Sequence, residues 1–247
     1  MRADQLDRDE FPERRPLEAM TFGQLAATVR ALDDQAVDPA VDPAREDRPG
    51  VVPGRRQRVV GVDGMSGSGK SGFARRLAAE LGAPVLSVDD LVPGWDALAE
   101  SVTLLSEGVL RPLAAGRPAR WRRYDWIAGR PGEWAGIEPG DFLVVEGCCV
   151  GLPPAAACLS YLIWVDATAA ERRRRLERRP DWGTYQPFAE RWARQEDALQ
   201  ADADTRHRAD LVVDNNQRSP DGDWADVFFG AARVERAPRR HTRHRCG

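Results

Sequence analysis

The chain has 247 residues, and its 36 Lys and Arg against 39 Asp and Glu give a formal net charge of −3. This balance offers no global positive field, so we expect neither nucleic acid nor a membrane surface as a partner. No apolar run approaches the ~20 residues of a membrane span, and the charged N-terminus lacks a signal-peptide core, which favours a cytoplasmic protein. Its four cysteines form no C-x-x-C pair and are expected to be reduced thiols.

Residues 1–56 are interpreted as an N-terminal extension. Thr21 and Gln24 form a capping box, with Met20 and Leu25 placed as a hydrophobic staple, which predicts that a helix starts here. A Pro- and Asp-rich linker follows over 38–56. The helix could dock on the main domain or bind a partner, and docking is the simpler alternative.

The central motif lies in RVVGVDGMSGSGKSGF, residues 58–73. It contains G-x-x-x-x-G-K-[ST], in which Gly-rich backbone cradles phosphate groups. The β-branched run 59–62 predicts a buried strand before the loop, and FARRLAAEL predicts an amphipathic helix after it. This context favours a phosphate loop over a chance glycine-rich turn. The nucleotide-binding residues are then Gly64, Ser66, Gly67, Ser68, Gly69, Lys70, Ser71 and Gly72.

Lys70 is the only lysine among the 36 basic residues. A compact ammonium on a flexible stem fits a phosphate site where a planar guanidinium fits poorly. We therefore expect Lys70 to contact the β- and γ-phosphates of ATP, and the Ser71 hydroxyl to bind Mg²⁺.

Five apolar segments within 57–216 predict a parallel sheet with helices on both faces, a three-layer α/β fold. The segments are 59–62, 84–88, 141–146, 161–166 and 208–214. Residues 119–127 are expected to form an extended strand or hairpin. Beyond them, 217–247 is a basic tail in which 224–234 could form a short helix. Its arginine-rich end is more simply a solvated segment than a nucleic-acid patch.

Acidic residues follow two of these segments. In an open α/β sheet, ligands bind at the carboxyl ends of the strands. Asp89 is the better candidate for a general base, although Asp90 could take that role while Asp89 caps the next segment. Glu146 ends DFLVVE in the manner of a Walker-B acid and is expected near the metal with Ser71.

An arginine-rich helix follows the fourth segment. Arg172, Arg175 and Arg179 fall on one face at i, i+3 and i+7. The residues could form a solvated helix, but a lid that closes over nucleotide phosphates explains their density better.

From Val59 to Asn215 the chain resembles the uridine/cytidine kinase and phosphoribulokinase branch of the P-loop kinases. The matching pieces occur in family order: GVDGMSGSGKS, LSVDD, WDAL, RRYDW, LVVEG, the WVDAT strand and RADLVVDN. The resemblance implies a P-loop NTPase fold with a lid like that of the nucleoside monophosphate kinases.

Roles also follow from this resemblance. It implies that Asp89 is the catalytic aspartate and that Arg172 and Arg175 are lid arginines. Asp96 would bind sugar hydroxyls, and Tyr124 and Trp126 would flank a nucleoside base. The family's base-contacting histidine is replaced by Gly129, and an aromatic residue near Asp89 by Val92.

The sequence therefore predicts an ATP- and Mg²⁺-dependent kinase whose acceptor is a nucleoside or related polyol. A sugar, nucleotide or vitamin alcohol remains an alternative acceptor. A nucleotide-binding regulatory protein with little turnover is the alternative of another class. The oligomeric state is open, and a homo-oligomer is compatible with the sequence.

Overall fold

The computed structural model describes residues 16–32, 57–216 and 224–233. Its main sheet has seven strands in the order β1-β9-β8-β7-β2-β6-β3. Seven strands correct the expected five. The five expected segments are all present as parallel strands, and two further strands extend the sheet at the β8 edge.

The parallel part of the sheet is formed by strands with nearly continuous apolar sequences, as burial on both faces requires. These strands are β3 (Val85–Ser87), β6 (Phe142–Glu146), β2 (Arg58–Asp63), β7 (Tyr161–Asp166) and β8 (Leu211–Asp214).

The added strands come from the two ends of the chain. β9 (Val227–Ala232) pairs antiparallel with β8, and β1 (Glu18–Thr21) pairs antiparallel with β9. A short helix was expected over 224–234, and that prediction is wrong. The start of β9 alternates between exposed and buried residues, a period of two that fits a half-buried strand. The described parts of both terminal segments thus each add a strand to the main sheet.

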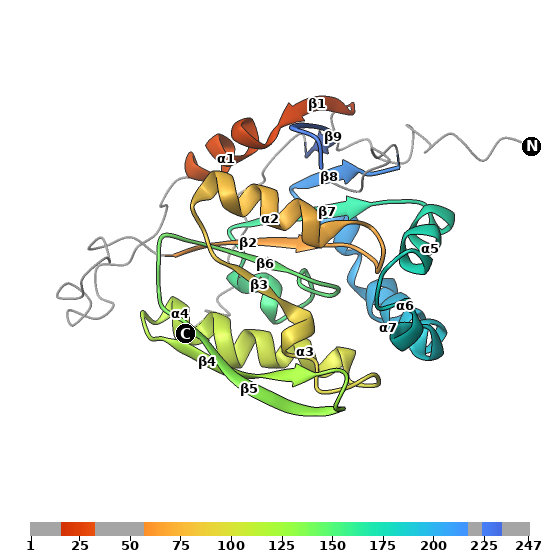
Figure 1. Ribbon diagram of the computed structural model, residues 1–247. Helices are drawn as coiled ribbons and strands as arrows, with labels where there is room; N and C mark the ends of the chain where they lie inside the picture. The colour runs from red at the N-terminus through yellow and green to blue at the C-terminus, as the bar shows by residue number, and fades with distance from the viewer. Residues whose placement is uncertain (1–15, 33–56, 217–223, 234–247) are drawn as a thin grey trace, which may run out of the picture.

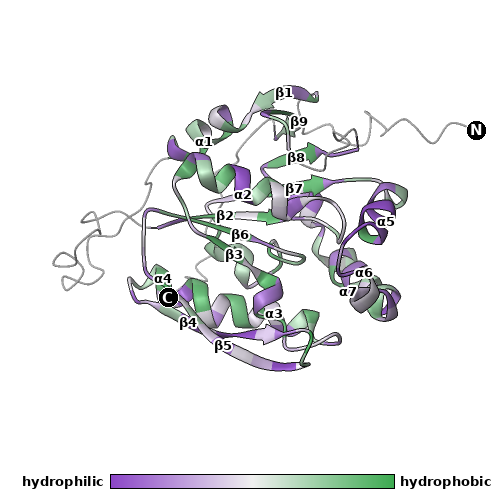
Figure 2. Cartoon of the chain, viewed as in Figure 1, coloured by the Kyte–Doolittle hydropathy of each residue, from purple (hydrophilic) through white to green (hydrophobic). Residues whose placement is uncertain are grey.

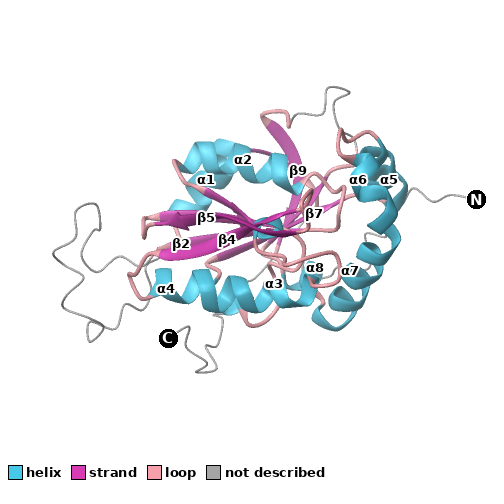
Figure 3. Ribbon diagram, turned by 60° about the horizontal axis from the view of Figure 1, so that its bottom comes forward, coloured by secondary structure: helices cyan, strands magenta, loops and turns pink. Residues whose placement is uncertain are grey.

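Helices cover both faces of the sheet (Figures 1 and 3). α1 (Phe22–Arg30) and α2 (Lys70–Leu81) pack on one face, with Val60 and Ile163 of the sheet in their core. α1 begins with the expected capping box between Thr21 and Gln24.

The opposite face carries a longer helical segment and a separate hairpin. The helix runs through α3 (Leu98–Leu105), a π-helical turn (Ser106–Leu110) and α4 (Arg111–Ala114). The expected hairpin is present, formed by β4 (Ala119–Asp125) and β5 (Arg130–Ile137). Gly129 closes its turn with a φ of +64°, in the left-handed region that glycine favours.

Four helices lie between β7 and β8 in the chain. They are α5 (Ala169–Glu177), α6 (Trp182–Tyr185), α7 (Ala189–Ala203) and α8 (Thr205–Arg208). α5 is strongly hydrophilic (Figure 2) and has no buried residue. Short 3-10 turns occur at Val88–Asp90, Ala155–Cys158 and Gln186–Phe188.

In the part of the chain that the structure describes, no helix has both the length and the apolar character that crossing a membrane requires.

Cys148 and Cys149 are free, buried thiols, whereas Cys158 is disulfide-bonded, which corrects the expectation of reduced cysteines for that residue.

Candidate functional site

The phosphate loop connects β2 to α2, as the sequence predicts. Its tight turn depends on glycine at two positions with positive φ, +149° at Gly64 and +81° at Gly67. A Cβ atom at Gly64 would lie 2.5 Å from the Val165 carbonyl oxygen, and one at Gly67 would lie 2.5 Å from that of Arg172. Close packing against β7 and α5 therefore excludes side chains here.

Asp63, the last residue of β2, fixes the start of the phosphate loop through hydrogen bonds. Its fully buried carboxylate accepts backbone N–H groups from Gly64 (2.7 Å), Cys149 (3.0 Å) and Gly151 (2.8 Å). Burial raises the pKa of Asp63, and these hydrogen bonds act in the opposite direction. The carboxylate thus connects the start of the phosphate loop to the loop that follows β6.

Arginines of α5 donate hydrogen bonds to carbonyl groups of the phosphate loop. The Arg175 guanidinium donates to the carbonyls of Gly67 (3.4 Å) and Ser68 (3.1 Å), and the Asn215 amide donates to Ser68 at 2.6 Å. Arg172 donates to the Ser66 carbonyl at 3.4 Å. Because C=O and N–H point in opposite directions across a trans peptide, these contacts orient the following N–H groups away from α5. Arg172 and Arg175 therefore lie against the loop backbone.

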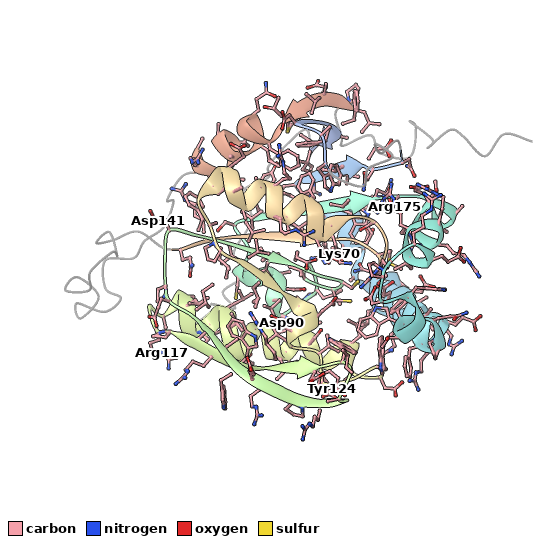
Figure 4. The ribbon with its side chains drawn as sticks, in the orientation of Figure 1. Lys70, Asp90, Arg117, Tyr124, Asp141 and Arg175 are labelled. Atoms are coloured by element: carbon pink, nitrogen blue, oxygen red, sulfur yellow. The ribbon has the colours of Figure 1, made fainter. Side chains whose placement is uncertain are left out.

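The expected metal residues meet at the carboxyl edge of the sheet. The Ser71 hydroxyl donates to Glu146 Oε2 at 3.0 Å. Hydroxyl and carboxylate oxygens are ligands that Mg²⁺ prefers, so this donor set fits the ion. In Figure 4, Lys70 and Arg175 lie toward this edge of the molecule, and Asp141 and Arg117 toward the opposite one.

Lys70 is 9% exposed and surrounded by acidic groups. Burial alone would lower its pKa, but its acidic neighbours, among them Glu146, Glu196 and Asp89, raise the pKa above its ordinary value. The ammonium therefore stays charged, as phosphate binding requires.

Asp89 follows β3, and its side chain is accessible to solvent although protein atoms surround it closely. The pKa of Asp89 is raised to about 6, mainly by burial; the charges of Lys70 and Arg179 act to lower it, and those of Glu146 and Glu196 act to raise it. Among the described residues, its carboxylate has neither a hydrogen bond nor an ion pair. Asp90, by contrast, pairs with Arg123 at 3.1 Å. This difference favours Asp89 for work on a substrate.

Arg179 lies beyond the end of α5, which corrects the expectation that it shares one helical face with Arg172 and Arg175, and its charge acts on Asp89. Its guanidinium lowers the Asp89 pKa, pairs with Asp181 at 2.6 Å and lies 5.8 Å from the centre of the Tyr185 ring. The three predicted lid arginines thus divide into two that hold the phosphate loop and one beside the candidate base.

Two of the predicted acceptor residues, Tyr124 and Trp126, belong to an aromatic cluster, which consists of Trp95, Tyr124, Trp126, Tyr185, Phe188 and Trp192. The Trp126 ring lies 4.5 Å from Trp95 and 5.0 Å from Tyr124 (centre to centre), and Trp95 stacks on Phe188 at 4.3 Å. The Trp126 indole also donates to the backbone carbonyl of Asp89 at 3.2 Å. These rings pack on one another, and the cluster abuts the candidate base.

Asp96 lies at the edge of this region, with 70% of its side chain exposed, and pairs with Arg191 of α7 at 3.0 Å. A carboxylate in this position is accessible to a ligand, although the ion pair must open or adapt to admit hydroxyl groups. Trp134, an aromatic residue of the same hairpin, is 64% exposed and stands outside the cluster.

Residues of the site that were not predicted include Asn215, Glu196 and Trp224. Asn215 directly follows β8, and a polar residue at the carboxyl end of a predicted strand could have identified it from the sequence. Glu196 lies at i+4 from Trp192 on the apolar face of α7, so an acid on a buried stripe could have identified it. Trp224 donates its indole N–H to the Gly69 carbonyl at 3.0 Å from a segment far away in sequence, and no local pattern indicates this contact.

Comparison with known proteins supports the fold. No protein-family model matches the chain, and no curated sequence matches it significantly. A structure described as a possible uridine kinase from Bacillus stearothermophilus is similar, with a TM-score of 0.53 and 17% identity over 77% of this chain and 96% of that one. A provisionally assigned fructose transport system kinase from Silicibacter sp. TM1040 is similar with a TM-score of 0.45 and 19% identity over 76% of this chain and 92% of that one. The first likeness shows a shared α/β fold.

Proposed function

We infer that this protein is an ATP- and Mg²⁺-dependent kinase that transfers the γ-phosphoryl group to a hydroxyl of a small molecule. The observation that carries this proposal is the placement of Asp89, accessible and unpaired among the described residues, in the field of Lys70. A regulatory protein that only binds nucleotide has no use for a base at this position. The pKa of about 6 leaves Asp89 largely ionised at neutral pH and able to accept a proton.

Phosphoryl transfer depends on positioning and on stabilising negative charge. In this proposal the backbone of the phosphate loop and Lys70 bind the phosphates, and Ser71 and Glu146 hold Mg²⁺. The ion neutralises charge on the phosphate oxygens when it is bound. Asp89 takes the proton of the acceptor hydroxyl, and Arg179 beside it adds positive charge. Arg172 and Arg175 act by keeping the loop in its binding shape.

For the acceptor we propose a uridine- or cytidine-like nucleoside or a related polyol, with Asp96 contacting hydroxyl groups and Tyr124 and Trp126 near the ring. A second candidate is an acceptor without a planar base, such as a sugar or a vitamin alcohol. The packing of Trp126 against Trp95, Tyr124 and Trp192 favours it, because these contacts occupy much of the aromatic surface. The proposal places the protein in the cytoplasm, where ATP is supplied.

The test is to incubate the protein with MgATP and a panel of nucleosides, sugars, nucleotides and vitamin alcohols, and to follow ADP release. Lys70→Ala serves as the inactive control, because it removes the buried ammonium from the phosphate loop. Acceptor-dependent ADP release that Lys70→Ala abolishes supports the kinase. Tight MgATP binding without acceptor-dependent release on any compound would favour the regulatory alternative.

A further inference from the structure

Glu196 of α7 is a buried carboxylate that the proposed chemistry does not use. Its side chain is 1% exposed, and it lies close enough to Lys70 to raise the pKa of that ammonium. A buried charge is costly unless hydrogen bonds compensate it. The partners of Glu196 therefore indicate its role.

These partners come mainly from the phosphate loop. The Ser66 hydroxyl donates to Glu196 Oε1 at 2.6 Å, and the Ser66 backbone N–H lies 3.1 and 3.2 Å from the two carboxylate oxygens. The Trp192 indole and the Cys148 thiol donate to Oε1 at 3.1 and 2.6 Å. Burial raises the pKa of Cys148 well above its usual range, so the thiol keeps the proton that it donates.

The N–H, the hydroxyl and the carbonyl of Ser66 are therefore all hydrogen-bonded. Glu196 binds its N–H and its hydroxyl, while Arg172 binds its carbonyl. Ser66 directly precedes Gly67, where the loop turns with a φ of +81°. Fixing Ser66 thus limits the conformations of the segment that must present its N–H groups to phosphate.

Gln195, the residue before Glu196, forms hydrogen bonds with the segment from Trp95 to Leu98. Gln195 donates to the Trp95 carbonyl at 2.7 Å and accepts from the Leu98 N–H at 3.3 Å. Consecutive residues of α7 therefore hold the phosphate loop and the segment that contains Asp96.

We propose that Glu196 is a positioning residue, which sets nucleotide affinity by holding Ser66 in the phosphate-binding shape of the loop. This inference rests on the proposed function only in that the loop binds nucleotide. Electrostatics alone predicts the opposite sign: a carboxylate near a polyphosphate opposes binding, so its removal would increase affinity. The direction of the change therefore distinguishes positioning from simple charge.

The experiment is calorimetric titration of the full-length chain with MgADP and with a non-hydrolysable MgATP analogue. Glu196→Ala leaves the Ser66 and Trp192 donors unsatisfied and should weaken binding roughly tenfold or more. Glu196→Gln keeps an acceptor oxygen and should recover much of this loss. Asp197→Asn is the matched control, since it removes an exposed negative charge from the next position of the same helix and should change affinity by less than about twofold.

Equal or tighter binding by Glu196→Ala would overturn the proposal. If that variant does not fold, Glu196→Gln and Ser66→Ala decide, singly and combined. A shared hydrogen bond predicts that the double variant loses less than the sum of the single losses, and additive losses contradict the proposal. A wild-type protein that binds neither nucleotide would overturn this inference and the proposed function together. Binding without turnover on the acceptor panel would remove the kinase and leave the role of Glu196 intact.

Discussion

The Ser71 hydroxyl donates a hydrogen bond of 3.0 Å to Glu146 Oε2. Ser71 lies at the start of α2, and Glu146 is the last residue of β6. β2 and β6 are neighbouring parallel strands, with Val62 opposite Glu146 in the register. The sheet itself therefore sets the distance between the phosphate loop and the acid. A motif on one strand and an acid 75 residues later form one oxygen-rich site because their strands pair.

We expect Glu146→Gln to raise the Mg²⁺ concentration required for half-maximal ADP release. The amide retains the size of the side chain but loses the charge that attracts a hard divalent cation. Titration of MgCl₂ at fixed ATP measures this shift. Glu133→Gln, an exposed position on β5, is the control. An unchanged Mg²⁺ dependence in Glu146→Gln would remove Glu146 from the metal site.

Asp89→Asn should lower kcat by about 10²- to 10⁴-fold with little change in MgATP affinity, because a base acts in the transition state. The wild-type protein should also gain activity as pH rises through about 6, since Asp89 accepts a proton only when it is ionised. In Asp89→Asn this rising limb should disappear. Asp90→Asn is the comparison: it breaks the pair with Arg123 and should leave the limb in place. If Asp90→Asn alone removes the limb, Asp90 is the base.

The sequence predicts those parts of the fold that depend on local pattern. The phosphate loop, the capping box of Thr21 and the five parallel strands follow from glycine spacing, side-chain hydrogen bonding and β-branched runs. β1 and β9 were not predicted, because short strands at a sheet edge are defined by their pairing more than by their composition. Tertiary pairing also overrode the expected helix at Trp224.

The site could be predicted only in part for a similar reason. Lys70, Ser71 and Glu146 lie where strand ends meet, a rule that needs no coordinates. The contacts of Arg175 with loop carbonyls and of Glu196 with Ser66 depend on how α5 and α7 dock. Helical periodicity identifies a face of α5, but it does not say whether that face meets phosphate or backbone.

Trp224→Phe should weaken MgADP binding by a factor of about two to ten, the equivalent of one neutral hydrogen bond. The variant removes the indole N–H that donates to the Gly69 carbonyl but keeps an aromatic ring against Phe73, whose centre lies 4.9 Å away. Calorimetry gives the affinity, and thermal unfolding reports any loss of packing. Asp226→Asn, which weakens only an exposed pair with Arg76, should bind nucleotide normally. A Trp224→Phe protein with lower thermal stability and unchanged affinity would assign Trp224 to packing alone.

The last prediction concerns the contact between the aromatic cluster and the candidate base. Trp126 donates its indole N–H to the backbone carbonyl of Asp89, and its ring packs against Trp95 and Tyr124. Trp126→Phe keeps most of the ring contacts and removes the hydrogen bond. If that bond sets the position of Asp89, kcat should fall by about two- to tenfold while the KM values for MgATP and for the best acceptor change little.

Two comparisons separate this outcome from the alternatives. Trp134→Phe alters an exposed ring of the same hairpin and should leave kcat unchanged. Asp96→Ala should raise the acceptor KM and leave the KM for MgATP unchanged, because Asp96 is accessible to a ligand and distant in sequence from the phosphate loop. A raised acceptor KM in Trp126→Phe would mean that the indole contacts the acceptor directly. In that case the ring cluster opens on binding, and a nucleoside becomes the better candidate over an acceptor without a planar base.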